Sequence, residues 1–233
     1  ARKKKPTADE IAEMAMSGRS SGVAFTYTEP IIWLEYIVDS SPLVREKGGA
    51  VVMVSNGEIN PDPLEELIEF TDAWNVDLKS WSDDFYRKHC SGDRKTVLHT
   101  IKTLAGSSCH LEITFLIIPE ENDDPEEWRE MANWISDQCG NDTVLHISRY
   151  FPRYKLRQQP TPIDTLLKAR DTFADKLQHV YIGNVSMENS NTICPSCGAI
   201  CVERNGWNVS TKGMDRGKCA SCGCELNIIH EIS

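Results

Sequence analysis

Five apolar runs in this chain each end in a short polar sequence, and each is followed by a helix-like stretch. These runs and a sixth strand-like segment are residues 22–30, 50–57, 74–79, 111–120, 144–152 and 179–185. Strands that alternate with helices predict a parallel sheet. The runs are almost continuously apolar, which is typical of strands covered on both faces. Because six strands cannot close an eight-stranded barrel, we expect an α/β fold that is an open, partial (β/α)6 TIM-like barrel.

Helix starts are marked by capping residues. Thr7 opens a capping box, Asp62 and Asp124 each stand before a proline, and Thr161 is placed similarly. The first visible element is the helix after Thr7, whereas a helix in a βα series follows a strand. We therefore expect that the first strand of the barrel is missing upstream. The absent initial Met agrees with an internal start.

Polar residues stand where the predicted strands end. In a parallel sheet, ligands bind beyond the carboxyl ends of the strands, so these residues are expected to converge on one mouth. The predicted ligand-binding residues are Thr28, Glu29, Ser55, Asn56, Asp77 and Lys79, with Glu120 and residues 149–154 near them. Asp77 and Lys79 share a face of their strand. The pair could hold a zwitterion with an attached ribose, or it could be an ordinary ion pair.

Composition excludes several classes of protein. The 233 residues carry a formal net charge of −10, which argues against a general nucleic-acid affinity. No apolar run is long enough to span a bilayer, and no signal peptide is visible. We expect a cytoplasmic protein that acts on neither nucleic acid nor membranes.

Six of the nine cysteines lie in the last 40 residues, after a polar linker that starts at Ser186. We therefore divide the chain into a barrel domain, residues 1–185, and a metal-binding ribbon, residues 186–233. Two Cys-x-x-Cys-Gly knuckles predict one tetrahedral metal site in a zinc-ribbon or rubredoxin-like module, with zinc favoured over iron. Its ligands are expected to be Cys194, Cys197, Cys219 and Cys222. Cys201 and Cys224 are surplus, which leaves an iron–sulfur cluster open as an alternative.

An ordered set of short motifs resembles a known family. Thr-Tyr-Thr-Glu-Pro30, Ser-Asn-Gly57, Asp-Leu-Lys79 and the Ile-Ile-Pro119 run, in this order, resemble the radical S-adenosylmethionine (SAM) enzymes, especially the pyruvate formate-lyase activating enzymes. The AmmeMemoRadiSam-system subgroup is closer still. Its members carry similar segments at residues 148–155 and 181–185 and a similar Cys-Pro-x-Cys-Gly tail.

The resemblance implies a mechanism and a set of partners. Glu29 and its neighbours would meet the SAM amino group, Ser55 and Asn56 would face the cofactor, and Asp77 and Lys79 would contact its ribose and carboxylate. A 4Fe-4S cluster, reduced by an electron donor, would cleave SAM so that hydrogen is abstracted from the substrate. That substrate could be a protein or an AmmeMemo-type operon partner. The catalytic residues themselves are not identified by the sequence.

Two departures from the family pattern stand out. Tyr27 and Thr28 replace two glycines, which questions how closely the backbone can approach the cofactor. In addition, no CxxxCxxC motif precedes Thr7, so the cluster ligands are expected outside this chain. On this interpretation the chain is the C-terminal part of a radical enzyme and is inactive alone.

Two other functions remain open. One is a degenerate barrel with a structural zinc ribbon, which binds SAM or a partner protein without turnover. The other is a lyase in which Lys79 forms a Schiff base beside Asp77. His146, inside the fifth run, is expected to be a hydrogen-bonded core histidine.

Overall fold

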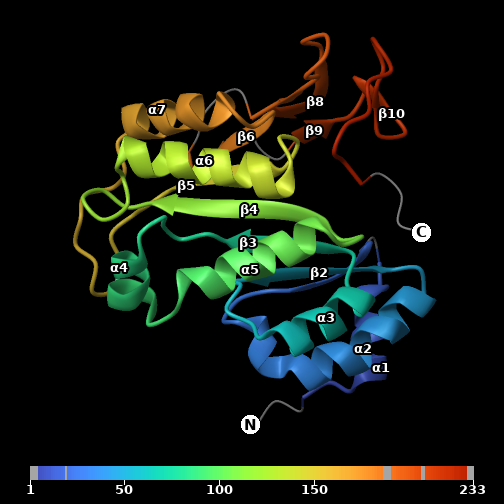
Figure 1. Cartoon of the computed structure of the whole chain (residues 1–233). Helices are drawn as coiled ribbons and strands as arrows, with labels where there is room; N and C mark the ends of the chain where they lie inside the picture. The colour runs from blue at the N-terminus through green and yellow to red at the C-terminus, as the bar shows by residue number, and fades with distance from the viewer. Residues whose placement is uncertain (1–4, 19, 186–189, 206–207, 230–233) are drawn as a thin grey trace.

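One parallel sheet organises the molecule (Figure 1). The computed structural model describes residues 5–18, 20–185, 190–205 and 208–229. Six strands pair in sequence order. They are β1 (Gly22–Phe25), β2 (Ala50–Ser55), β3 (Ala73–Asp77), β4 (His110–Ile117), β5 (Val144–Arg149) and β6 (His179–Gly183). Each overlaps a predicted run, which confirms the parallel α/β sheet. Within the described residues β1 and β6 remain edge strands, so the sheet is open.

Helices follow the strands, as the alternating pattern predicted. They are α1 (Ala8–Ala15), η1 (Pro30–Trp33), α2 (Leu34–Glu46), α3 (Pro61–Phe70), α4 (Asp83–Phe85), η2 (Tyr86–Cys90), α5 (Arg94–Ala105), α6 (Pro125–Cys139) and α7 (Ile163–Ala174). The capping box at Thr7 is present, since its side chain accepts from the Glu10 amide at 3.2 Å and its amide donates to the Glu10 carboxylate at 2.8 Å. Asp124 caps α6 as predicted.

Two predicted helix starts were wrong. Helix α3 is preceded by Asn60 rather than Asp62, because Pro61 supplies the fixed φ of a first helical residue two residues before Pro63. Helix α7 begins after Pro162, and Thr161 does not cap it. The fully buried Thr161 hydroxyl instead donates to the Ile117 carbonyl at 2.6 Å and accepts from the Tyr150 amide at 2.9 Å. The hydroxyl therefore ties together the ends of β4 and β5.

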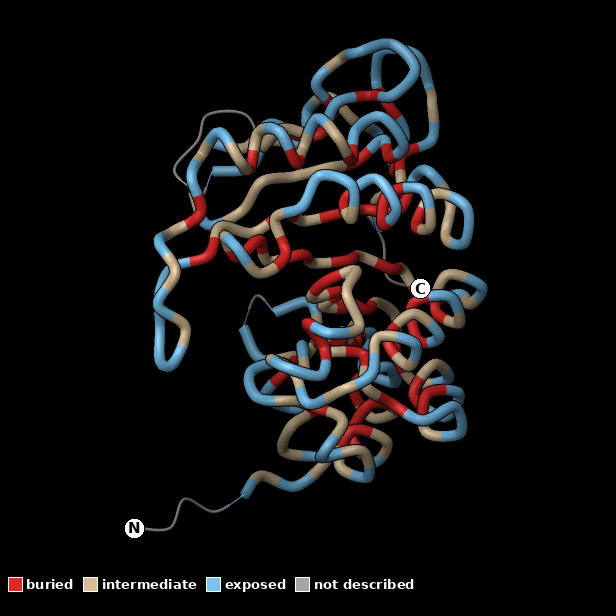
Figure 2. The backbone as a smooth tube through the Cα atoms, turned by 60° about the vertical axis from the view of Figure 1, so that its left-hand side comes forward, coloured by how far each residue is buried: buried red, intermediate tan, exposed pale blue. Residues whose placement is uncertain are grey.

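The two faces of the sheet are unequally covered. Along β4 every second residue is buried, while the residues between them are only half-buried. The buried set packs under the helices with Trp74, Trp128 and Phe173, and Figure 2 shows the buried stretches along the strands and inner helix faces. The expectation that both faces are covered was wrong, because in the described part of the chain the side chains on the inner face of β2, β3 and β4 are only half-buried. On this inner, concave face, polar side chains of β3 to β5 such as Glu112 and His146 lie beside apolar ones of β2 such as Val52.

A small module follows the parallel sheet and its helices. Its strands are β7 (Thr192–Ile193), β8 (Ile200–Asn205), β9 (Asn208–Ser210), β10 (Met214–Asp215) and β11 (Lys218–Cys219). Strands β8 and β9 form the predicted ribbon, although Gly206 and Trp207 lie outside the described residues, as does most of the predicted linker at 186–189. The β4 arrowhead in Figure 1 points left, and the module lies at the right. It therefore sits toward the amino ends of the strands.

No helix among the described residues is both long and apolar enough to cross a membrane.

The covered face should dominate stability. Ile147 on β5 is fully buried in the core, so Ile147→Ala removes packed methyl groups and leaves a cavity. We expect a loss of about 3 kcal/mol in the free energy of unfolding, measured by urea denaturation. Met14→Ala on α1, where the side chain is 62% exposed, should change it by less than about 0.5 kcal/mol. Equal losses of unfolding free energy in the two variants would contradict the claim that the covered face dominates stability.

Candidate functional site

Glu29 joins the ends of β1 and β2. One carboxylate oxygen accepts a hydrogen bond from the Ser55 hydroxyl, and the other accepts from the Asn56 amide, both at 2.8 Å. The same carboxylate caps η1 through the Ile31 amide at 3.4 Å. Three of the predicted ligand-binding residues therefore form one cluster. A carboxylate offers about four lone-pair positions, so Glu29 can still accept from a ligand ammonium.

The backbone before Glu29 is strained. Tyr27 and Thr28 both adopt φ of 57°, in the left-handed region that glycine prefers. This conformation costs an L-residue roughly 1–2 kcal/mol, and it is rarest for β-branched residues such as Thr. The chain thus adopts at Tyr27 and Thr28 the type of backbone conformation that two glycines would favour. The Tyr27 side chain is 90% exposed beside the cluster.

Asp77 and Lys79 form the second part of the rim. The Lys79 ammonium donates to the Asp77 carboxylate at 2.7 Å, and both side chains are about one-third exposed. The Lys79 backbone is fixed from two sides. Its amide donates to the Tyr86 hydroxyl at 3.1 Å, and its carbonyl accepts from the Asn122 side chain at 2.7 Å. The ion pair that the sequence allowed as one alternative is present, and its solvent exposure leaves both side chains accessible to a ligand.

Neighbouring strands place the two parts of the rim side by side. Ser55 on β2 is opposite Val76 on β3 in the parallel register, so Asn56 and Asp77, the residues that follow them, lie at neighbouring strand ends. No hydrogen bond links the two parts within the described chain. The structure therefore brings five of the six predicted residues into two local clusters at adjacent strand ends, and Thr28 precedes Glu29 in the chain without joining either cluster.

Some residues of this region were missed by sequence reasoning. Asn122 is buried and also holds the β4–α6 turn, since its side chain accepts from the Ile118 amide at 2.6 Å. A row across the concave face continues from Asp77 through Thr114 and His146 to Tyr181 in the strand register. The alternation along β4 and β5 could have indicated this row once the strand register was known.

The four predicted metal ligands converge. The sulfur atoms of Cys194, Cys197, Cys219 and Cys222 all lie within 4.8 Å of one another. Backbone hydrogen bonds, led by the Cys222 amide, lower the pKa of the Cys219 thiol to about 6. Both knuckle glycines, Gly198 and Gly223, have the positive φ that these turns need. A tetrahedral thiolate site fits this geometry. Cys201 and Cys224 lie outside the quartet.

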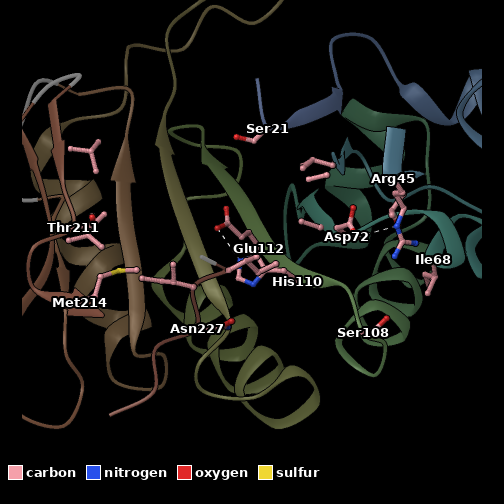
Figure 3. A pocket seen from close by; sticks show the side chains of 18 of the residues that line it. Ser21, Arg45, Ile68, Asp72, Ser108, His110, Glu112, Thr211, Met214 and Asn227 are labelled. Carbon is pink, nitrogen blue, oxygen red and sulfur yellow. Dashed lines mark hydrogen bonds and ion pairs between the residues drawn. The ribbon is translucent and has the colours of Figure 1, made fainter. Parts of the chain in front are cut away.

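The cysteine module is placed away from the rim. A cavity of about 1200 Å³ separates it from the sheet, lined on one side by Ala50, Ala73 and His110 near the amino ends of their strands. Arg204, Thr211 and Met214 of the module line the other side (Figure 3). Asp77 and Lys79, in contrast, lie at the carboxyl end of β3. The metal site and the rim are thus at opposite ends of the sheet.

Comparisons with known proteins identify relatives of this chain. No family model matches the chain. It is 39% identical over 228 residues to the uncharacterized protein MJ0808 of Methanocaldococcus jannaschii, across 96% of this chain and 68% of that protein. The chain belongs to the same family as this archaeal protein. It is also 24% identical over 137 residues to the pyruvate formate-lyase 1-activating enzyme of Escherichia coli strain K12, and it spans 55% of that enzyme's length.

Solved structures share the fold. A domain of the pyruvate-formate lyase-activating enzyme from Bacteroides vulgatus matches 71% of this chain and all of that chain, with a TM-score of 0.63 and 16% identity. SuiB from Streptococcus suis matches 78% of this chain and 44% of that chain in its complex with SAM, with a TM-score of 0.60 and 10% identity. In its complex with the precursor peptide SuiA, it covers 76% of this chain and 42% of that chain, with a TM-score of 0.62 and 10% identity.

Distant homology to an activating enzyme, together with this fold, supports membership of the radical SAM superfamily. The superfamily resemblance predicted from the motifs is thereby confirmed, and the relatives support enzyme status in general.

Relief of backbone strain gives a test of the β1 end. Thr28→Gly removes the left-handed penalty of about 1–2 kcal/mol but adds about 0.4–1 kcal/mol of unfolded-state entropy. We expect the free energy of unfolding to rise by roughly 0.5–1 kcal/mol in urea denaturation. The neighbouring Thr26→Gly, which relieves no positive φ, should lower it. Destabilisation by both substitutions would show that Thr28 is not strained.

If the four clustered cysteines are the metal ligands, substitution of a cysteine inside the quartet should release the metal, and substitution of one outside it should not. Cys219→Ser removes one of four thiolates, so we expect less than one-tenth of the metal to remain after dialysis, measured by elemental analysis. Cys224→Ser, outside the quartet, should retain the wild-type metal content. Loss of metal from Cys224→Ser, with retention in Cys219→Ser, would contradict the ligand assignment.

Proposed function

We propose that this chain is the SAM-binding part of a radical SAM enzyme of the activating-enzyme type. The observation that carries the proposal is the Glu29 carboxylate, which reaches from the end of β1 to the Ser55 hydroxyl and the Asn56 amide. This contact places an anionic acceptor at the carboxyl rim of a parallel sheet. Ligands of such folds bind at this rim.

The residues of the rim fit the parts of SAM. Glu29 accepts from the amino group, which is a cation at neutral pH, and charge-assisted bonds of this kind are the strong ones. Asp77 offers a carboxylate to the ribose hydroxyls, and Lys79 offers an ammonium to the SAM carboxylate. The Tyr86 hydroxyl and Asn122 hold the Lys79 backbone in place. Bound SAM supplies the reactive carbon–sulfur bond, while this chain binds and orients it.

The described residues do not fit a 4Fe-4S cluster at the same rim. Cys90 is near enough to Lys79 and Asp77 for their charges to affect its thiol, although burial is the main cause of its raised pKa. One thiol cannot hold a cluster that needs three or four. The cysteine quartet lies at the other end of the barrel. We therefore assign the cluster, and its electron donor, to residues or proteins outside this chain.

A protein substrate is supported by the loop after β5. Two hydrogen bonds join the ends of this loop: the Thr161 amide donates to the Tyr150 carbonyl, and the Tyr150 amide donates to the Thr161 hydroxyl. Residues 151–160 therefore form a loop beyond the strand ends whose two ends are held together. Tyr154 is 83% exposed, and Phe151 is also exposed. Exposed aromatic side chains are typical of sites that contact other proteins. SuiB, which shares the fold, is described as bound to a precursor peptide. An AmmeMemo-type partner and a cytoplasmic location remain part of this proposal.

SAM affinity tests the proposal directly. Asp77→Ala removes a charged acceptor worth about 1.5–3 kcal/mol, so we expect SAM to bind roughly 10- to 100-fold more weakly in calorimetry. Asp171→Ala, on the outer helix α7 far along the chain from the rim, should bind SAM as the wild type does. An unchanged affinity in Asp77→Ala, with SAM bound by the wild type, would remove Asp77 from the site.

A further inference from the structure

The loop after β5 is basic, although the protein as a whole is acidic. The chain has 35 acidic residues against 25 Lys and Arg, whereas the segment from Ser148 to Gln159 carries four basic side chains and no acidic one. These four are Arg149, Arg153, Lys155 and Arg157. Figure 1 shows the connection from β5 to α7 at the left, beyond the β4 arrowhead. The strand ends therefore carry a positively charged segment.

The four cations of this loop are not neutralised by the part of the chain that the structure describes. No ion pair joins any of them to a carboxylate among those residues. Arg149 is half-buried, and its Nε donates to the Thr161 carbonyl at 2.8 Å. Arg153, Lys155 and Arg157 are exposed. The loop can therefore pair with carboxylates supplied by another molecule.

Two exposed aromatic rings lie among the cations. The Arg149 guanidinium lies over the Phe151 ring, 4.9 Å from its centre, and the Lys155 ammonium lies over the Tyr154 ring, 5.3 Å from its centre. Such contacts hold a cation beside an apolar surface. Tyr154 also has a φ of 57°, in the left-handed region that is uncommon for an aromatic residue. Strained backbone of this kind is concentrated at functional sites.

Hydrogen bonds connect the loop to the second part of the rim. The Gln158 side chain donates to one oxygen of the Glu121 carboxylate at 2.8 Å, and the Lys88 ammonium of η2 donates to the other at 2.8 Å. Tyr86, also on η2, accepts from the Lys79 amide. The loop is therefore fixed, through η2, to the backbone of a residue in the proposed SAM site.

We propose that this loop binds an acidic segment of the protein on which the enzyme acts. Arginine and lysine pair with carboxylates, and complementary charge across an interface sets specificity and the rate of association. The rings of Phe151 and Tyr154 pack against apolar groups between those carboxylates, as exposed aromatic residues do at interfaces. The inference rests on the proposed function and adds the substrate class, a protein with aspartate or glutamate near the reacting residue. A nucleic acid is a polyanion that extends beyond one loop, and the rest of this chain is acidic.

Fluorescence anisotropy with labelled peptides tests this charge preference. The probe is a short peptide of glycine and glutamate with one central tyrosine, and its control has glutamine in place of every glutamate. We expect the wild type to bind the acidic peptide at least about 10-fold more tightly at low salt, and high salt to reduce the difference because exposed charges are screened. Equal affinities for the two peptides, no binding of the acidic one, or tighter binding of a labelled oligouridylate would overturn the proposal.

Matched double variants locate the contact on the loop. Lys155→Gln with Arg157→Gln removes two exposed cations, so the acidic peptide should bind at least about 5-fold more weakly. Lys102→Gln with Lys176→Gln removes two exposed cations at the far ends of α5 and α7, toward the amino ends of the strands, and should leave the affinity unchanged. Full affinity in the loop variant, or equal weakening in both variants, would contradict the assignment.

SAM affinity in the same proteins separates this inference from the proposed function. Calorimetry should show that the loop variant binds SAM as the wild type does, because neither substituted side chain bonds to Glu29, Asp77 or Lys79. SAM binding without any binding of the acidic peptide would overturn this inference alone. Binding of the acidic peptide by a wild type that does not bind SAM would support the loop assignment and contradict the proposed function.

Discussion

The carboxylate of Glu29 connects the ends of β1 and β2 with the start of η1. It fixes the β1 end against the β2 end through Ser55 and Asn56, and it caps η1, which leads into α2. The connection requires Tyr27 and Thr28 to turn through left-handed conformations. Strained backbone persists only where the surrounding contacts hold it, and it is concentrated at functional sites. The strained turn at Tyr27 and Thr28 therefore supports the proposed ligand site at the β1 end.

The parallel sheet separates two kinds of chemistry along its length. Polar side chains that suit an organic, charged ligand lie at the carboxyl ends of the strands, around Asp77 and Lys79. The thiolate quartet lies beyond the amino ends, in a module held to the barrel by Tyr181 and by a bond of 2.9 Å from Asn227 to the Asp142 carbonyl. Between the two ends, the concave face carries His110, Glu112 and His146. The module can thus act as a structural clasp without contacting the rim.

Sequence reasoning predicted the parts of this molecule that depend on local pattern. The strands, the capping box at Thr7 and the cysteine quartet follow from periodicity, hydrogen-bond chemistry and knuckle spacing, which are short-range properties. The prediction of the α3 start failed because two neighbouring positions suit a helix start: Asp62 before Pro63 was predicted, but the helix begins at Pro61. Sequence reasoning also failed where a side chain serves a distant partner: Thr161 resembles a helix cap but bonds the end of β4.

The concave face could not be predicted from the sequence for a related reason. The strands are nearly continuous apolar runs, so their sequences resemble strands that are buried on both sides. The half-buried residues on the inner face become apparent only in the assembled, open sheet. His146 was expected to be a hydrogen-bonded core residue. It is hydrogen-bonded, but its partner Glu112 stands on another strand, and both side chains remain one-third exposed. Strand register, which no single run specifies, brings them together.

We propose that the carboxyl rim of the sheet, centred on Glu29, binds SAM, and a crystal structure of this chain soaked with SAM would show whether it does. We expect SAM to lie across the ends of β1 to β3, with its amino group within hydrogen-bonding distance of the Glu29 carboxylate. Well-defined SAM bound elsewhere, for instance in the cavity beside the cysteine module, with the rim left to solvent, would contradict it.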